Sequence, residues 1–288
     1  ISHLNVKTGA SKNAWENVMK LVKITRENDD LDILTECIPY KYGPGNYLAP
    51  FPDWFLNDGF EEAIKKLDDD NIRDRLKADC DRYWRFIHRG EWDRVILSSS
   101  HNHPEFVGHT FEEISDKWGK DPWDCFFDLL KDEGTKLENL SLLGRLFNEE
   151  HVRDMIRNPY FMLTSDATPL STKGELSSIS NNIAAYSWTA KILGYYVRQE
   201  KVLKLEEAVR KMTSMPARKF GLKKRGIIKE GMIADLVLFN PSTIRELGTI
   251  KHPKRNPAGI EFVFINGELV VEKGEYNNKT LGKLIRYN

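Results

Sequence analysis

The sequence predicts an α/β protein with a parallel sheet, followed by a small β domain. Residues 161–163 are apolar and lead into Ser165 and Asp166, as a buried parallel strand does when it carries a carboxylate to the end of a barrel. Residues 1–38 follow a strand, helix, strand order, which is the repeat of a parallel sheet. Residues 223–288 are punctuated by glycines and contain Asn266 and Gly267, a strong hairpin-turn signal.

The composition argues against several classes of protein. The chain of 288 residues has 43 Lys and Arg and 43 Asp and Glu, so its net charge is zero and nothing attracts nucleic acid or an acidic membrane surface. Cys37, Cys80 and Cys125 lie far apart and are odd in number, which argues against a disulfide framework. No apolar run is long enough to span a bilayer. We therefore expect a cytoplasmic protein.

The first part of the chain predicts one βα repeat. Residues 1–6 alternate in polarity like the end of a strand, and apolar residues recur at helical spacing over 15–24. Residues 31–38 predict a second strand, closed by Pro39 and by the Gly-Pro-Gly sequence at 43–45.

A long, charged stretch then predicts an inserted helical region at about 54–150, because it exceeds an ordinary βα loop. Thr110 and Glu113 form a capping-box pattern, and Pro122 suits the first position of a helix. The expected elements are helices over 60–67, 70–90, from 111 onward, over 122–130 and 148–157, and a strand over 94–99.

Apolar helices are expected over 183–200 and 204–214, with a compact turn-and-helix unit at 216–221. The composition changes after residue 222. We therefore place a first domain at 1–222, which includes the insertion, and a β domain at 223–288.

Several motifs resemble a known family. Residues 226–237 (GIIKEGMIADLV) and 265–267 (ING) resemble the closing β-sandwich of the amidohydrolase superfamily. The likeness is strongest to the N-acyl-D-amino-acid deacylases, or D-aminoacylases. The segments that carry it are LGYYVR at 193–198, LEEAVRKMTSMPA at 205–217, FGL at 220–222, Ser165 with Asp166, and Ile1 to His3.

The resemblance implies a fold for the whole chain. It would be the C-terminal half of a (β/α)8 (TIM) barrel with a helical insertion, plus part of a small β-sandwich. His3 would end the sixth barrel strand, Glu36 to Tyr40 would follow the seventh, and Asp166 would end the eighth. The chain begins without Met, so we expect it to be a fragment, with the upstream half of the protein as a separate chain or an omitted segment.

The resemblance also implies an activity, the hydrolysis of a linear amide bond in a small molecule. His3 would bind one of one or two zinc ions, with the other ligands upstream. Bound zinc lowers the pKa of its water to about 7 and polarises the carbonyl. Asp166 would shuttle the proton from this water to the leaving nitrogen. Tyr40 and Ser165 would contact the substrate, with Tyr40 near the scissile carbonyl.

Each of these residues has a plainer interpretation. Asp is common at helix N-termini and in turns, so Asp166 fits either role. Tyr40 could pack at the mouth of the barrel, and a single histidine near a terminus, such as His3, is usually structural. His101 and His103 match the spacing of a metal pair, but they fall inside the insertion, where the family carries a loop.

One region departs from the family pattern. Shortly after the catalytic aspartate the deacylases carry an arginine for the substrate carboxylate, whereas residues 178–184 contain none and Lys173 lacks the fork geometry. This departure puts an N-acyl-D-amino-acid substrate in question and leaves the hydrolase chemistry intact. Two other interpretations stay open: a cyclic amidase of the hydantoinase or dihydroorotase kind, which would share His3, Asp166 and the sandwich, and a catalytically silent homologue kept as an oligomerising scaffold. The sequence is compatible with a homo-oligomer.

Overall fold

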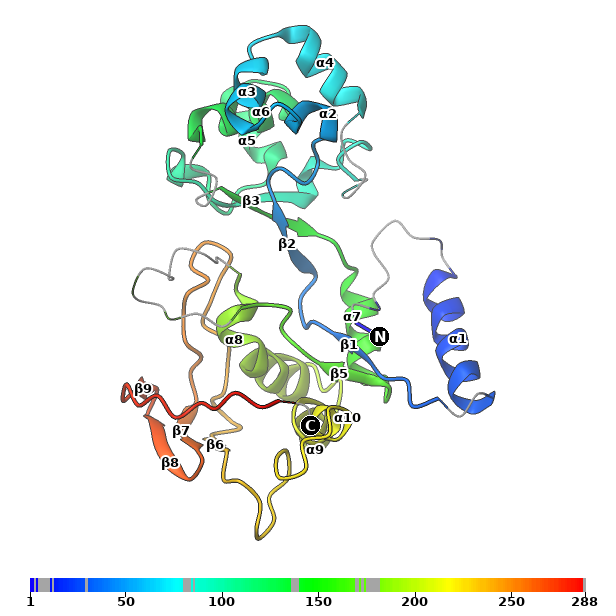
Figure 1. Ribbon diagram of the computed structural model, residues 1–288, viewed down its shortest axis with the longest axis vertical. Coiled ribbons are helices and arrows are strands. Elements are labelled where there is room, and N and C mark those ends of the chain that lie inside the picture. The colour runs from blue at the N-terminus through cyan, green and yellow to red at the C-terminus, as the bar shows by residue number, and fades with distance from the viewer. Residues whose placement is uncertain are drawn as a thin grey trace. The chain divides into compact units, whose positions relative to one another are not determined.

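Two short parallel strands form the centre of one part of the chain. In the computed structural model, β1 (Thr35–Cys37) lies beside β5 (Phe161–Leu163), in register along their whole length (Figure 1). The N–H of Thr164 donates to the carbonyl of Cys37 at 3.0 Å and extends the ladder by one bond. All of β5 is buried, as expected of a parallel strand that is covered on both faces. The strands predicted over 31–38 and 161–163 are both present, and they are parallel.

The structure describes residues 1, 2, 4, 11, 13–28, 31–79, 84, 86–135, 140–168, 171, 174 and 182–286. The chain divides into two compact units. Unit 1 consists of Ile1–Tyr40, Phe147–Pro169 and Ile183–Asn288, and unit 2 of Lys41–Leu146 and Leu170–Asn182. The domain boundaries expected from the sequence remain a prediction.

The helices of unit 1 agree with the sequence analysis. The helix expected over 15–24 is present, and the one expected over 183–200 is continuous, although its second half is a π-helix. Residues 1, 2 and 4, in contrast, are not in a strand, and the rest of the strand expected over 1–6 lies outside the described residues. The helices are α1 (Ala14–Asn28), α7 (Glu149–Arg157), α8 (Ala184–Lys191), η5 (Ile192–Gln199), α9 (Leu205–Met212) and α10 (Ser214–Lys219).

A buried lysine ties α9 to the end of α7. The ammonium of Lys211 donates to the carbonyl oxygen of Ile156 at 2.6 Å and to that of Asn158. The last carbonyls of a helix have no partner within the helix, so the ammonium satisfies them and complements the helix dipole. The side chain is 0% exposed, and this burial lowers the pKa of Lys211 to about 8. This contact fixes the helix that leads into β5.

An antiparallel sheet of four strands forms the C-terminal part of unit 1. Its strands follow chain order, β6 (Leu236–Phe239), β7 (Ile260–Ile265), β8 (Glu268–Glu272) and β9 (Glu275–Tyr276). Asn266 and Gly267 connect β7 to β8 with φ values of 52° and 82°, the left-handed conformation that a tight hairpin requires. The predicted hairpin is confirmed.

Unit 2 contains a sheet that the sequence analysis missed. Three antiparallel strands lie in the order β2, β4, β3 among short helices, where only one strand was expected. In chain order the elements are β2 (Tyr42–Asn46), α2 (Asp53–Leu56), α3 (Phe60–Lys66), α4 (Asp70–Asp79), η1 (Trp92–Arg94), β3 (Val95–Ser99), η2 (Pro104–Phe106), α5 (Phe111–Trp118), α6 (Pro122–Glu133) and β4 (Ser141–Arg145).

Two expectations for unit 2 were wrong. Residues 43–45 do not form a closing turn but lie in β2, because Trp84 packs where a Cβ of Gly45 would stand. The helix expected over 70–90 ends at Asp79, and residues 86–90 form turns. Strand β3 and the capping box of Thr110 and Glu113, in contrast, are confirmed.

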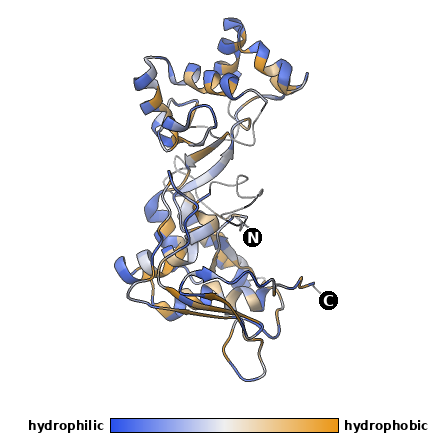
Figure 2. Cartoon of the chain, turned by 90° about the vertical axis from the view of Figure 1, so that its left-hand side faces the viewer, coloured by the Kyte–Doolittle hydropathy of each residue, from blue (hydrophilic) through white to orange (hydrophobic). Residues whose placement is uncertain are grey.

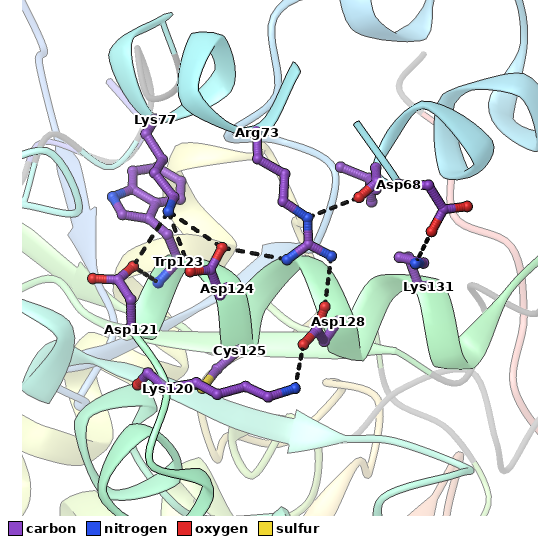
Figure 3. Close-up of polar contacts among 11 residues, drawn as sticks. Asp68, Arg73, Lys77, Lys120, Asp121, Trp123, Asp124, Cys125, Asp128 and Lys131 are labelled. Carbon is purple, nitrogen blue, oxygen red and sulfur yellow. Dashed lines mark hydrogen bonds and ion pairs between the residues drawn. The ribbon is translucent and has the colours of Figure 1, made fainter. Parts of the chain in front are cut away.

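Ion pairs join α4 to α6 within unit 2. Asp121, Asp124 and Asp128 lie on one face of α6 or at its start, as their helical spacing requires. Arg73 of α4 reaches Asp124 at 3.3 Å and Asp128 at 2.6 Å, and Lys77 reaches Asp124 at 3.2 Å (Figure 3). Apolar side chains of both helices are buried, Leu76 in α4 and Phe126, Phe127 and Leu130 in α6. Figure 2 shows how hydrophobic and hydrophilic residues are distributed along the chain.

No helix within the described residues has both the length and the apolar character needed to cross a membrane.

The depressed pKa of Lys211 predicts a pH dependence of stability. Between pH 8 and the ordinary value of 10.5 the unfolded chain holds a proton that the folded chain has released, so the contribution of Lys211 to stability increases as the pH rises. We expect the free energy of unfolding of the wild type, minus that of Lys211→Met, to rise by about 1 kcal/mol from pH 7 to pH 9. Urea unfolding at the two pH values measures this.

The upper limit of pH 9 for these unfolding measurements is set by Cys37. Burial raises the pKa of the Cys37 thiol from 9.0 to about 12, so its contribution to stability declines as the pH rises above 9. Cys37 is present in both proteins, and its effect largely cancels in the difference. A difference that does not change with pH would contradict a lysine buried in this way.

Candidate active site

The candidate site lies at the carboxyl edge of the β1 and β5 pair. Thr164, Ser165 and Asp166 follow β5, and Tyr40 comes three residues after β1. Because the two strands are parallel, the segments that follow them leave from the same edge, where α/β barrels carry their catalytic side chains. The structure thus brings three of the predicted site residues, Asp166, Ser165 and Tyr40, to one edge.

Asp166 has an uncommon backbone conformation. Its φ is 47°, in the left-handed region, and its side chain is exposed although it follows a fully buried strand. Asp and Asn tolerate this region better than most residues, and non-glycine residues held in it cluster at functional sites as well as in turns. The sharp change of direction presents the carboxylate outside the strand. Ser165, beside it, is half-buried.

Tyr40 is held inside unit 1 rather than exposed. Its side chain is 4% exposed, and its hydroxyl donates to Oε1 of Glu246. The ammonium of Lys191 lies 4.5 Å from the centre of the Tyr40 ring and 3.5 Å from Oε2 of Glu246. Burial, and next the charge of Glu246, raise the pKa of Tyr40 far above its ordinary value, so the phenol stays protonated. Burial also raises the pKa of Glu246, while Lys191 opposes that shift.

The sequence analysis did not find Glu246 or Lys191. Glu246 is 206 residues away from Tyr40 along the chain, and nothing in its local sequence marks it. The plainer interpretation of Tyr40, a packed side chain, describes its burial correctly. It does not account for the carboxylate and the ammonium that the phenol meets there.

His3, the predicted metal ligand, lies outside the described residues. Its neighbour Ser2 donates to Oε1 of Glu36 in β1 at 2.6 Å, so the start of the chain lies beside this strand. The described part of the chain contains no group of three or more His, Cys, Asp or Glu side chains that could hold a metal ion. These residues therefore do not by themselves form a zinc site, and we derive no step of a reaction through a metal.

One histidine of the predicted pair in the insertion, His103, has structural partners. Nε2 of His103 lies 2.9 Å from a carboxylate oxygen of Asp132, and its ring stacks on Phe106 and meets the edge of Trp118. These contacts favour a loop-stabilising role for His103.

Most of the region expected to meet a substrate carboxylate lies outside the described residues. Within residues 178–184, those up to 181 lie outside the described part of the chain, as does Lys173.

Fold and site together define an α/β protein that collects candidate catalytic side chains at the carboxyl edge of parallel strands. The sequence model of the amidohydrolase family matches residues 113–271, more than half of the chain, and the chain belongs to this family. The membership agrees with the resemblance found in the sequence.

Two curated relatives come from Alcaligenes xylosoxydans xylosoxydans. The chain is 27% identical over 192 residues to the D-aminoacylase of this organism, and the matched region covers 67% of this chain and 37% of that protein. The chain is 31% identical over 197 residues to the N-acyl-D-glutamate deacylase of the same organism, and this match covers 67% of this chain and 36% of that protein. The chain thus spans little more than a third of these relatives.

Solved structures of the same kind share the fold. A D-aminoacylase with a binuclear metal centre superposes with a TM-score of 0.67 at 23% identity, over 97% of this chain and 48% of that one. The N-acyl-D-glutamate deacylase of Bordetella bronchiseptica, complexed with zinc and a phosphonate inhibitor, gives a TM-score of 0.66 at 21% identity, over 94% and 46%. The chain therefore has the α/β fold of these amidohydrolases over about half their length.

The left-handed backbone of Asp166 predicts an order of stabilities. A residue with a Cβ costs roughly 1–2 kcal/mol in this region and glycine does not, so we expect Asp166→Gly to be about 1 kcal/mol more stable than Asp166→Ala in urea unfolding. Both variants lack the carboxylate, so its lost contacts cancel.

The same pair of substitutions at Asp116, an exposed position in α5, provides the control. There alanine should be the more stable residue by about 0.5–1 kcal/mol, because glycine weakens a helix. If alanine were also the more stable residue at position 166, the backbone conformation described for Asp166 would be wrong.

Proposed function

We propose that this chain is the C-terminal part of a zinc-dependent hydrolase that cleaves a linear amide bond, of the N-acyl-D-amino-acid deacylase type. The observation that carries the proposal is the exposed carboxylate of Asp166, turned outward by a left-handed residue at the end of a buried parallel strand. Membership of the amidohydrolase family and the deacylase names of the relatives support it.

In this proposal β1 and β5 are the seventh and eighth strands of a (β/α)8 barrel, and His3 ends the sixth. Unit 2 is the insertion between the last two strands, and the sheet of β6 to β9 is part of a β-sandwich. The other strands belong to a part of the protein outside this sequence. The coverage of about half of each solved structure supports this arrangement. The remaining strands would close the barrel, so that no edge strand is left unpaired.

Asp166 acts as the proton shuttle. Its carboxylate takes a proton from the water that attacks the amide carbon, and later gives that proton to the nitrogen as the C–N bond breaks. The products are a carboxylic acid and an amine. His3, with ligands from the rest of the barrel, would hold the zinc, which would supply an activated water and polarise the carbonyl. The binuclear metal centre and the zinc of the structural neighbours support this cofactor.

Tyr40 and Ser165 contact the substrate. The phenol of Tyr40 keeps its proton and donates it to Glu246, so its oxygen takes part as a hydrogen-bond acceptor and not as a base. The substrate is a small molecule with an N-acyl group on an amine. The region after Asp166 contains no arginine, so a free carboxylate would need another partner than in the deacylases.

The proposal predicts a loss of chemistry without a loss of metal. Asp166→Asn keeps a residue that tolerates the left-handed region but cannot take a proton. In the complete protein we expect kcat to fall by about 10³-fold, with an unchanged zinc content. The assay uses a panel of N-acyl-D-amino acids, their L-forms and cyclic imides, and metal analysis accompanies it.

Asp116→Asn is the matched control and should retain full activity, because Asp116 is exposed in α5. Activity confined to the cyclic imides would favour a cyclic amidase instead. Wild-type protein that binds zinc but hydrolyses no member of the panel would favour a silent scaffold, and full activity of Asp166→Asn would exclude the proton-shuttle role.

A further inference from the structure

A buried polar cluster in unit 1 is not explained by the fold alone. Tyr40 donates to Glu246, and Lys191 lies over the Tyr40 ring and 3.5 Å from the same carboxylate. Burying a carboxylate is costly unless it is paired and hydrogen-bonded, and here one phenol and one ammonium supply those partners. Three apolar side chains of similar volume could fill this space without the cost of removing charged groups from water. We therefore look for a functional role of this cluster.

We propose that Glu246 is a positioning residue, which holds the Tyr40 hydroxyl at the carboxyl edge of β1 for the hydrolytic reaction. The inference rests on the proposed function, because it assigns Glu246 a role only through Tyr40. Glu246 belongs to the segment between β6 and β7, far from the strands of the site in sequence.

The backbone beside Tyr40 is fixed by a neighbouring helix. Tyr196 of η5 is fully buried, and its hydroxyl shares its one proton between two acceptors, Oε1 of Glu149 at 3.0 Å and the carbonyl of Pro39 at 3.2 Å. Pro39 directly precedes Tyr40, so this hydrogen bond restrains the start of the segment that carries the phenol. The π-helical form of η5 fits such a role, since π-helical turns are rare and often occur at functional sites.

The same helix fixes the segment that carries Glu246. Arg198 of η5 donates to the carbonyl oxygens of Pro241 at 3.0 Å and Ile244 at 2.6 Å. At Gly194, a Cβ would meet the carbonyl of Ile244, so only glycine allows this close approach. Both ends of the Tyr40–Glu246 hydrogen bond are therefore attached to η5, and Lys191 is the last residue of the adjoining α8.

The hydrogen bond also orients the phenol. A phenol has one proton, so its donation to Glu246 sets the rotation of the hydroxyl and leaves the oxygen lone pairs on the other side. Glutamine at position 246 would keep a hydrogen bond to the phenol, whereas leucine would fill a similar volume and keep none. This difference separates positioning from simple packing.

The test is a double-mutant cycle on kcat in the complete, zinc-loaded protein. We expect Glu246→Leu to lower kcat for an N-acyl-D-amino acid by about 10- to 100-fold when Tyr40 is present, and by less than about 2-fold in Tyr40→Phe. Glu246→Gln should retain more activity than Glu246→Leu. Glu200→Gln, which alters an exposed ion pair with Arg153 next to η5, is the control and should change nothing.

Urea unfolding of the same variants tests the contact without relying on activity. The midpoint should fall in each single variant, and the double variant should fall by less than the sum of the two shifts. Additive shifts would mean that the contact is absent and would overturn the inference. An equal loss of kcat from Glu246→Leu with Tyr40 and with Phe at position 40 would overturn it too, while leaving the proposed hydrolase intact. An inactive wild type would overturn both.

Discussion

The parallel pairing of β1 with β5 is the constraint on which the candidate site depends. Two segments separated by more than a hundred residues meet in register, and each then turns outward at the same edge. One turn presents an exposed carboxylate on a left-handed residue, and the other carries a buried phenol. A shift of one residue in the register would send alternate side chains to the opposite face and separate these groups.

Residues from the C-terminal half of unit 1 contact the segments that adjoin this pair of strands. Lys211 closes the end of α7, which leads into β5, and η5 holds both the segment after β1 and the segment before β7. Lys211 and Tyr196 place an ammonium and a hydroxyl group in buried positions, where an unpaired polar group would be costly. We infer that the helices after Ile183 serve mainly to fix the edge at which Asp166 and Tyr40 lie.

What could be predicted from the sequence was local. The capping box of Thr110 and Glu113, the Asn266 and Gly267 hairpin and the apolar strand before Asp166 each depend on a few neighbouring residues, and all three are present. The sheet of unit 2 was missed because Gly43, Pro44 and Gly45 have the composition of a turn. They lie in a strand because the ring of Trp84 packs against this ribbon, which no local pattern reveals.

The candidate site was predictable to the same extent. Asp166, Ser165 and Tyr40 were found from strand ends and from the family resemblance, and the structure brings their segments to one edge. Glu246, Lys191 and Lys211 were not found, because their partners are distant in the chain and a charged residue in a sequence is normally expected to be exposed. Only three-dimensional packing identifies a buried charge.

The most direct test of the account is a crystal structure of the complete protein with zinc and a phosphonate analogue of an N-acyl-D-amino acid. We expect the phosphonate at the carboxyl edge of β1 and β5, with an oxygen of Asp166 within about 3 Å of a phosphonate oxygen. A phosphonate bound elsewhere, with Asp166 facing only solvent, would contradict the assignment of this edge as the active site.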